Sequence, residues 1–234
     1  MVQIKQFSFN IFQEHTMLAW KDGPACVVID PGFYSTEEEQ EFFSFIGENG
    51  LKPEAVLLTH AHFDHIFGVA KVQEKFGIPV YMDPKEELSF TYNEDMTALL
   101  GLSAPDTGFR YTEAREGMTI DAAGFSFEVL STPGHAPGAV CFLDREEKLM
   151  FTGDTLFAGT IGRTDLLNSD YDQEILSIMN KLIILDPEIQ FHPGHGPGST
   201  IGRERTHNPF LEPFNEPEEN FDPDADPVII KGLQ

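Results

Sequence analysis

A strand-loop-helix unit in the first third of the chain constrains the fold more than any other segment. Residues 55–58 form a continuous apolar run, which is typical of a strand that is buried on both faces. Residues 66–76 have the pattern of a helix, and Gly77 supplies a helix stop. The sequence therefore predicts a buried strand that passes through one short loop into a helix.

The loop of this unit carries three histidines and one aspartate within six positions, namely His60, His62, Asp64 and His65. Alternate residues that leave a strand direct two side chains to one point, while the residues that open the helix direct theirs to a neighbouring point. Imidazole and carboxylate groups are common metal ligands. We therefore predict a metal site that serves two ions; the alternative is a set of solvated loop histidines.

Three further residues of ligand type each follow a glycine at the end of a strand-like run. Glycine allows the backbone to approach an ion closely, so these positions are candidate ligands. The residues are His135, Asp154 and His195. Of the eight histidines, His15, His192 and His207 receive no ligand role. His192 is near His195 in the sequence, and in an alternative interpretation it lines the pocket. His15 is expected at the end of a strand.

Strand and helix signals in the rest of the chain predict two sheets in one domain, residues 1–210. Helices are predicted around Phe42 and after Asp170, each with a capping signal at its start. The segment 90–110 gives no clear assignment. Residues 211–234 are acidic and proline-rich, which predicts an extended or mobile tail. Strand-like runs occur at residues 5–12, 16–20, 26–29, 78–82, 124–130, 139–143, 148–151 and 189–191.

Composition excludes several classes of protein and partner. Hydrophobic residues make up 41% of the chain and charged residues 23%, which predicts a soluble globular protein. The formal net charge of −24 makes nucleic acids and anionic membrane surfaces poor partners. No apolar run reaches the roughly 18–20 residues of a membrane-spanning helix and no signal peptide is recognised, so we expect a cytoplasmic protein. Cys26 and Cys141 are expected to be buried free thiols.

Four motifs, taken in order, resemble those of the metallo-beta-lactamase-fold hydrolases. They are Thr-His-Ala-His-Phe-Asp-His at 59–65, Pro-Gly-His at 133–135, Phe-Thr-Gly-Asp-Thr-Leu-Phe at 151–157 and Pro-Gly-His-Gly-Pro at 193–197. The segments 162–166, 200–204 and 208–210 are similar to those of the glyoxalase II, or hydroxyacylglutathione hydrolase, branch. The resemblance covers residues 10–210 and implies an α/β protein with a four-layer αββα sandwich, in which the metals lie at one edge.

The resemblance also implies a role for each candidate ligand. It places His60, His62 and His135 on a first metal, Asp64, His65 and His195 on a second, and Asp154 between the two. Asp64 and Asp154 are thereby the catalytic carboxylates. The nitrogen and oxygen ligands suit two divalent ions, with zinc as our first choice and iron or manganese as alternatives.

Three other residues are predicted to support the ligands without touching a metal. Asp30 orients a ligand histidine in one interpretation and only forms a turn in the other. Arg163 and Asp165 are expected to form a buried ion pair that braces a metal loop, in preference to direct contact with the substrate.

The predicted activity is hydrolysis of a small-molecule thioester, such as an S-acylglutathione, by a metal-bridging hydroxide. Full-length members of the resembled branch add a helical domain with basic residues for glutathione, whereas this chain is short and acidic after residue 210, as in a compact bacterial subgroup. The acyl and thiol parts of the substrate, and the oligomeric state, therefore stay open. The alternatives are a mononuclear iron persulfide dioxygenase, another hydrolase of the fold (for a lactone, beta-lactam or phosphoester), and a non-catalytic metal-binding module.

Overall fold

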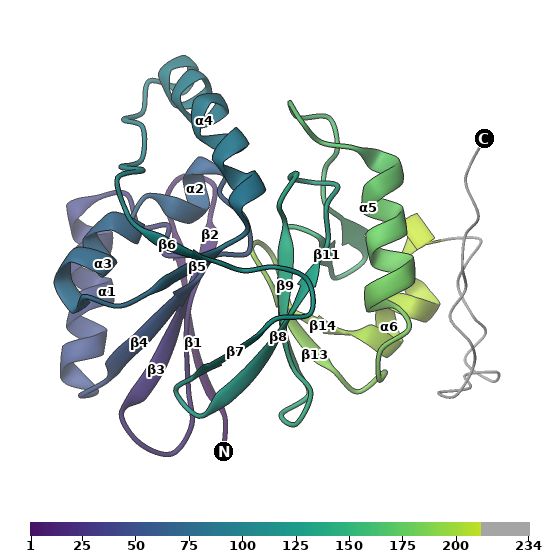
Figure 1. Cartoon of the computed structure of the whole chain (residues 1–234), viewed down its shortest axis with the longest axis horizontal. Helices are drawn as coiled ribbons and strands as arrows, with labels where there is room; N and C mark the ends of the chain where they lie inside the picture. The colour runs from purple at the N-terminus through teal and green to yellow at the C-terminus, as the bar shows by residue number, and fades with distance from the viewer. Residues whose placement is uncertain (212–234) are drawn as a thin grey trace.

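The computed structural model describes residues 1–211 and consists of two six-stranded sheets packed face to face, with helices on the outer faces (Figure 1). This arrangement confirms the predicted αββα sandwich. The predicted tail falls on residues 211–234, and all of it except Leu211 lies outside the described residues. Leu211 itself is buried at the end of a short 3-10 turn, Pro209–Leu211. Within residues 1–211, no helix combines the length and the apolar character needed to cross a membrane.

The first sheet has the strand order β1-β2-β3-β4-β5-β6. Its first three strands are antiparallel neighbours, and β3 to β6 are parallel because helices connect them. The strands are β1 (Gln3–Phe9), β2 (Glu14–Trp20), β3 (Ala25–Ile29), β4 (Lys52–Leu57), β5 (Val80–Met82) and β6 (Tyr111–Glu113). The helices are α1 (Thr36–Glu48), α2 (Phe63–Ile66), α3 (Val69–Phe76) and α4 (Glu87–Leu100).

The second sheet has the order β14-β13-β10-β9-β8-β7, and β10 pairs with β13 in parallel. The strands β8, β10 and β13 therefore run in one direction and end at the same edge. The strands are β7 (Thr119–Ala122), β8 (Phe125–Ser131), β9 (Val140–Asp144), β10 (Leu149–Gly153), β13 (Gln190–Pro193) and β14 (Ser199–Thr200), with a separate hairpin of β11 (Leu156–Phe157) and β12 (Thr160–Ile161). Helix α5 (Tyr171–Ser177) continues into a π-helical turn, Ile178–Leu182, and α6 (Ile201–His207) follows β14.

Alternation along the buried strands divides the core into layers. On β9, Val140 and Phe142 face the space between the sheets, while Cys141 and Leu143 face the helices on the outside. Cys26 on β3 likewise lies in the cluster under the helices of the first sheet. Both cysteines are free and buried, as predicted, and burial raises the pKa of each thiol to about 12.

Two helical segments differ from the sequence prediction. The helix predicted at 66–76 is interrupted at 67–68, between α2 and α3. Gly68 lies against the ring of Phe33 at this point, and a Cβ there would be 2.5 Å from two ring carbons. The unassigned segment 90–110 contains most of α4. A turn capped by Asp83 precedes this helix, and Gly101, in a left-handed conformation, ends it. Helix α4 projects beyond the sheets at the top of Figure 1.

Candidate metal centre

The seven predicted ligand residues meet at one end of the sandwich. His60 and His62 lie in the loop that follows β4, and Asp64 and His65 lie on α2. The other three follow β8, β10 and β13, the three strands that end at one edge of the second sheet. They are His135, Asp154 and His195. Topology thus brings segments from both sheets to one point.

Six of the seven side chains form two groups. The ligand atoms of His60, His62 and His135 all lie within 4.8 Å of one another, and the closest pair is His135 Nε2 and His62 Nδ1 at 2.9 Å. The ligand atoms of Asp64, His65 and His195 form a second group within the same limit, in which His195 Nε2 lies 3.3 Å from Asp64 Oδ2. These are the two sets of three that the resemblance implied.

The carboxylate of Asp154 lies between the two groups. Its Oδ2 is 3.6 Å from His135 Nε2 in the first group and 3.5 Å from His195 Nε2 in the second. Its Oδ1 is 3.6 Å from His65 Nε2. A single carboxylate therefore reaches donors of both groups, which is the placement that a bridging ligand requires.

Buried polar atoms at this point fit a cation. His60 Nε2, His65 Nε2 and Asp154 Oδ1 are buried without a hydrogen-bond partner among the described residues. A buried polar atom without a partner is costly, and several that converge on one point are satisfied together by a metal ion. Gly194 leaves room for this approach, since a Cβ there would lie 2.4 Å from Asp154 Oδ1 and 2.5 Å from His65 Cε1.

The protonation states of His60, His62 and Asp154 suit a metal. Burial lowers the pKa of His62 to about 3 and that of His60 well below its ordinary value, so both imidazoles are neutral and offer a lone pair. Burial alone raises the pKa of Asp154, but the neighbouring His65 and His195 outweigh it and hold that pKa well below the ordinary value. Neutral imidazole and ionised carboxylate are the forms that bind metals. At His65 and His195 burial lowers the pKa, but Asp154 and Asp64 outweigh it and raise the pKa of both rings, so a cation would replace a proton there.

Asp30 supports the cluster from behind. Its Oδ1 accepts a hydrogen bond from Thr59 N at 2.8 Å, and its Oδ2 accepts one from Thr59 Oγ1 at 2.5 Å. The same Oδ2 lies 3.2 Å from His65 Nδ1. A proton held on Nδ1 by this carboxylate leaves His65 Nε2 free to face the cluster. The geometry therefore favours the orienting interpretation of Asp30 over a role in the turn alone.

Arg163 and Asp165 form the predicted ion pair, but the prediction that it is buried is wrong. Arg163 Nε donates to Asp165 Oδ1 at 2.7 Å, yet the two side chains are 63% and 69% exposed. Both residues lie in the irregular loop after β12, where side chains two positions apart reach solvent. The main chain of Arg163 supplies the brace instead, because its carbonyl oxygen lies 2.9 Å from His135 Nδ1.

The remaining three histidines belong to neither group, although the ring of His15 lies 6.5 Å from that of His195. His192 lines a different cavity with Val2 and Ile4, so the alternative in which it lines the site is wrong. His15 is buried at the start of β2, as predicted, and its Nδ1 lies 3.1 Å from the carbonyl oxygen of Pro193. His207 ends α6.

Two buried glutamates hold the ligand loops and were missed in the sequence. Glu174 on α5 accepts a hydrogen bond from His135 N at 2.9 Å. Glu86 accepts from Ala61 N at 2.6 Å and from Gly138 N at 2.7 Å. Burial raises the pKa of Glu174 to about 8 and that of Glu86 to about 7. The only sequence signal is for Glu174, which lies one turn before Ile178 on the buried face of its helix.

Helix α4 and its preceding turn hold the peptide between two of the ligands. Glu86 accepts from the N–H of Ala61, and Asn93 Nδ2 donates to the carbonyl oxygen of Ala61 at 2.7 Å. Ala61 separates His60 from His62, so both ends of its backbone are fixed by one element. This arrangement makes Glu86 and Asn93 positioning residues for the first group of ligands.

Asn93→Ala is expected to weaken metal binding by about tenfold, because the carbonyl of Ala61 loses its buried partner and His62 loses its fixed direction. Competition with a chelator measures this effect. Asn49→Ala is the matched control, because Asn49 Nδ2 also donates to a carbonyl oxygen, that of Phe45, but on the exposed end of α1. A lower melting temperature with unchanged metal affinity would show that Asn93 serves stability alone.

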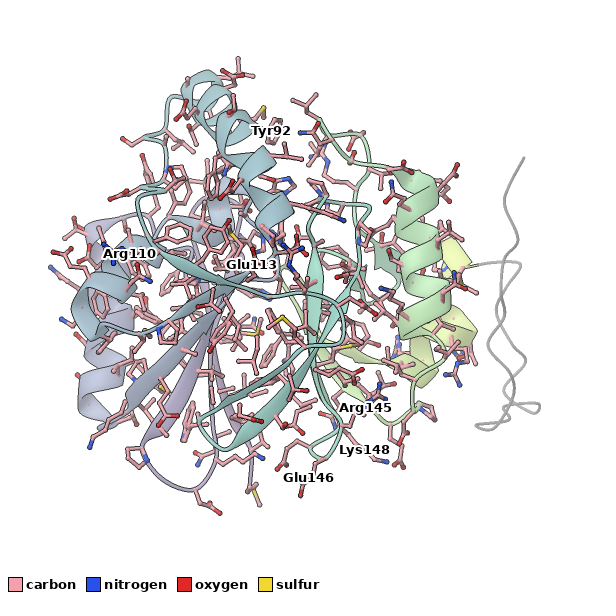
Figure 2. The ribbon with its side chains drawn as sticks, viewed as in Figure 1. Tyr92, Arg110, Glu113, Arg145, Glu146 and Lys148 are labelled. Carbon is pink, nitrogen blue, oxygen red and sulfur yellow. The ribbon has the colours of Figure 1, made fainter. Side chains whose placement is uncertain are left out.

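A cavity of about 680 Å³ opens beside the seven residues. Figure 2 shows Tyr92, one of its lining residues, on α4 at the opposite end of the molecule from Arg145, Glu146 and Lys148. The cavity borders His62, Asp64, His135, Asp154 and His195, so a ligand inside it contacts the cluster directly. A concave site next to a group of metal-binding side chains is suited to catalysis on a small molecule.

Comparisons with known proteins point to one superfamily. A model of the metallo-beta-lactamase superfamily matches residues 10–201. The hydroxyacylglutathione hydrolase GloC of Haemophilus influenzae is 37% identical over 216 residues, which cover 90% of this chain and 98% of that protein. The solved structure of the BLEG-1 B3 metallo-beta-lactamase has a TM-score of 0.82 and 35% identity, covering 90% of this chain and 100% of the other. TTHA1623 in a di-iron-bound form has a TM-score of 0.79 and 38% identity, covering 88% of this chain and 100% of the other.

Proposed function

The chain belongs to the metallo-beta-lactamase superfamily and is a metallo-hydrolase, and on this premise we propose that it hydrolyses thioesters with two divalent cations. One observation carries the proposal: the carboxylate of Asp154 lies within 3.6 Å of ring nitrogens from both histidine-containing groups. A second support is the similarity to GloC, a hydroxyacylglutathione hydrolase.

The donor set guides the choice of metal. Imidazole nitrogens and carboxylate oxygens suit zinc, iron and manganese alike, and zinc is our first choice. The di-iron form of TTHA1623 makes iron the strongest competitor. When bound, the two ions would supply a hydroxide at neutral pH and positive charge for the carbonyl oxygen of the substrate. His60, His62 and His135 would hold one ion, and Asp64, His65 and His195 the other, with Asp154 shared.

The side chains beside the cluster favour a thioester over an amide. Water adds to the carbonyl carbon, the carbon–sulfur bond breaks, and the products are a carboxylate and a thiol. A thiolate leaves readily without a proton because an ordinary thiol has a pKa of about 8.5, whereas an amine must be protonated as it leaves. Apart from the cluster, the only titratable residues that line the cavity within residues 1–211 are Tyr92 and Arg163. Burial raises the pKa of Tyr92, which makes it a poor proton donor.

Neither cysteine competes as a nucleophile. Cys26 and Cys141 lie under the outer helices, away from the cavity, and burial keeps both thiols protonated. The chain's own contribution would therefore be to hold the cations, to orient the His65 ring through Asp30, to fix the ligand loops through Glu86 and Glu174, and to enclose the substrate. We further propose that its partner is a small-molecule thioester. The cytoplasmic location stays a prediction.

Zinc-loaded protein is expected to hydrolyse S-lactoylglutathione, with free thiol released in proportion to metal content. Elemental analysis of protein purified without chelators is expected to give two divalent ions per chain. Protein stripped with a chelator is the control and should release no thiol. If the protein binds a single iron, leaves the thioester intact and consumes oxygen with glutathione persulfide, the proposal fails and the dioxygenase alternative holds.

A further inference from the structure

The cavity beside the metal centre has mostly apolar walls. Three of its side chains, Tyr92, Met96 and Leu100, recur at every fourth residue of α4 and so share one face of the helix. The opposite wall comes from β11 and β12 and the loop that follows. The large apolar lining residues outside α4 are Phe12, Phe63, Phe157, Ile161 and Leu166.

Cationic groups for an anionic ligand are scarce in the same cavity. Outside the metal-binding cluster, Arg163 is the only charged side chain among its lining residues within 1–211. Its guanidinium donates two hydrogen bonds to Asp165, at 2.7 and 2.9 Å, so an anionic ligand would have to compete with this carboxylate. A glutathione group brings two carboxylates, and the net charge of −24 opposes their approach. Any cations at the centre would face the carbonyl group rather than these carboxylates.

Exposed apolar residues neighbour the lining residues of the cavity in the sequence. Leu100 lines it and is 43% exposed, and its neighbour Leu99 is 79% exposed. Ile11 and Leu167, which adjoin the lining residues Phe12 and Leu166, are also exposed. Three segments that are far apart in the sequence therefore carry an exposed apolar residue directly before or after a lining residue. A substrate with a long apolar arm would remove this surface from water, which is favourable in proportion to the area covered.

We propose that the enzyme acts on thioesters that carry a bulky apolar arm, such as a medium-chain or aryl acyl group, in preference to multiply charged thiol conjugates. This inference rests on the proposed thioester hydrolysis. The apolar arm lies between α4 and the β11–β12 hairpin, against Met96 and Leu100. Glutathione thioesters with small acyl groups are hydrolysed, but slowly.

The test is a matched series of thioesters assayed with the zinc-loaded, full-length protein. One uncharged thiol, N-acetylcysteamine, carries acetyl, butyryl, hexanoyl or phenylacetyl groups, and glutathione carries the same four. We expect kcat/KM to rise at least about tenfold from acetyl to hexanoyl, because each buried methylene adds to binding. We also expect each N-acetylcysteamine ester to exceed its glutathione counterpart. Equal rates along the series, or faster glutathione esters throughout, would overturn the inference while leaving thioester hydrolysis intact.

Met96→Lys tests the same inference from the side of the protein. The added charge in the apolar wall should lower kcat/KM for the hexanoyl ester about tenfold or more and that for the acetyl ester by a smaller factor, so that the ratio of hexanoyl to acetyl kcat/KM falls. Leu88→Lys is the control, because Leu88 is 60% exposed on the same helix and does not line the cavity. Met96→Ala serves as a second variant if the lysine disturbs folding, and it should lower the hexanoyl rate selectively. An unchanged preference for hexanoyl in both Met96 variants would overturn the inference.

A binding measurement separates failure of this inference from failure of the proposed function. The S-hexyl thioether of N-acetylcysteamine cannot be hydrolysed, and calorimetry with metal-loaded protein should show binding that Met96→Lys weakens and Leu88→Lys does not. If no thioester is hydrolysed but the thioether binds in this way, the apolar preference holds and the proposed reaction is wrong. If thioesters are hydrolysed and the thioether does not bind, the reaction holds and the apolar preference is wrong.

Discussion

Replacement of Asp154 by alanine is expected to abolish thioester hydrolysis and to lower the metal content below two ions per chain. The carboxylate lies within 3.6 Å of ring nitrogens of both sets of ligands, so its loss would leave each ion with three protein ligands and without this shared one. The decrease in turnover should exceed the roughly 10–100-fold that is typical of residues outside the metal ligands. Thiol release and elemental analysis measure the two effects.

The fold should survive this substitution, because Asp154 Oδ1 makes no hydrogen bond to the described part of the chain. Asp144→Ala is a control of the opposite kind. Asp144 is also buried, but it accepts hydrogen bonds from Ser126 N, Glu146 N and Glu147 N on another side of the second sheet. Its loss should lower the free energy of unfolding by about 1–3 kcal/mol and leave metal content unchanged. Full activity in Asp154→Ala would refute the site.

Asp30→Ala is expected to lower turnover by about 10–100-fold with metal still bound. The substitution removes the acceptor that fixes Thr59 and the carboxylate that faces His65 Nδ1, so the His65 ring is free to turn away from the cluster. Two donors of Thr59 also lose their buried partner, which should lower the free energy of unfolding by about 1–3 kcal/mol. Steady-state kinetics and denaturant unfolding distinguish these effects.

Asp30→Asn separates orientation from stability. The amide oxygen still accepts from Thr59 N, so unfolding should change less than in Asp30→Ala, while the partner of His65 Nδ1 is weakened and turnover still falls. Asp22→Ala is the surface control, because the Asp22 side chain is 92% exposed and pairs only with the N-terminal amine in the described structure. Normal turnover per bound metal in both Asp30 variants would reduce Asp30 to a turn residue.

The candidate cluster could be predicted from the sequence because its ligand residues occur in short local motifs. His60, His62, Asp64 and His65 sit within six positions, and His135 and His195 each follow a glycine at a strand end. The complete division of the ligands into two groups of three depends on sheet topology. From the sequence, this division was available only through the resemblance to the family. The three-dimensional grouping agrees with that pairing, while the metals themselves stay a prediction.

The parts that the sequence could not predict depend on contacts between distant segments. Glu86 lies 25 residues from Ala61 and 52 from Gly138, and no local pattern links a glutamate to backbone groups so far away. The exposure of Arg163 and Asp165 follows from the path of one loop, which the residue types do not determine. The buried residues of helix α4 are the polar Ser89, Asn93 and Thr97, while Leu88 and Leu99 are exposed, so the usual amphipathic signal is weak there.

Two adjacent faces of α4, one buried and one lining the cavity, link properties that proteins often vary independently. One face, with Asn93, grips the backbone between His60 and His62, and the adjacent face, with Met96, forms the wall of the cavity. A descendant of this chain that replaced or shortened the helix to accept a different substrate would also loosen its hold on its cofactor. Substrate selectivity and metal binding therefore depend on the same helix. A change of substrate should arise from single substitutions on the face of α4 that lines the cavity.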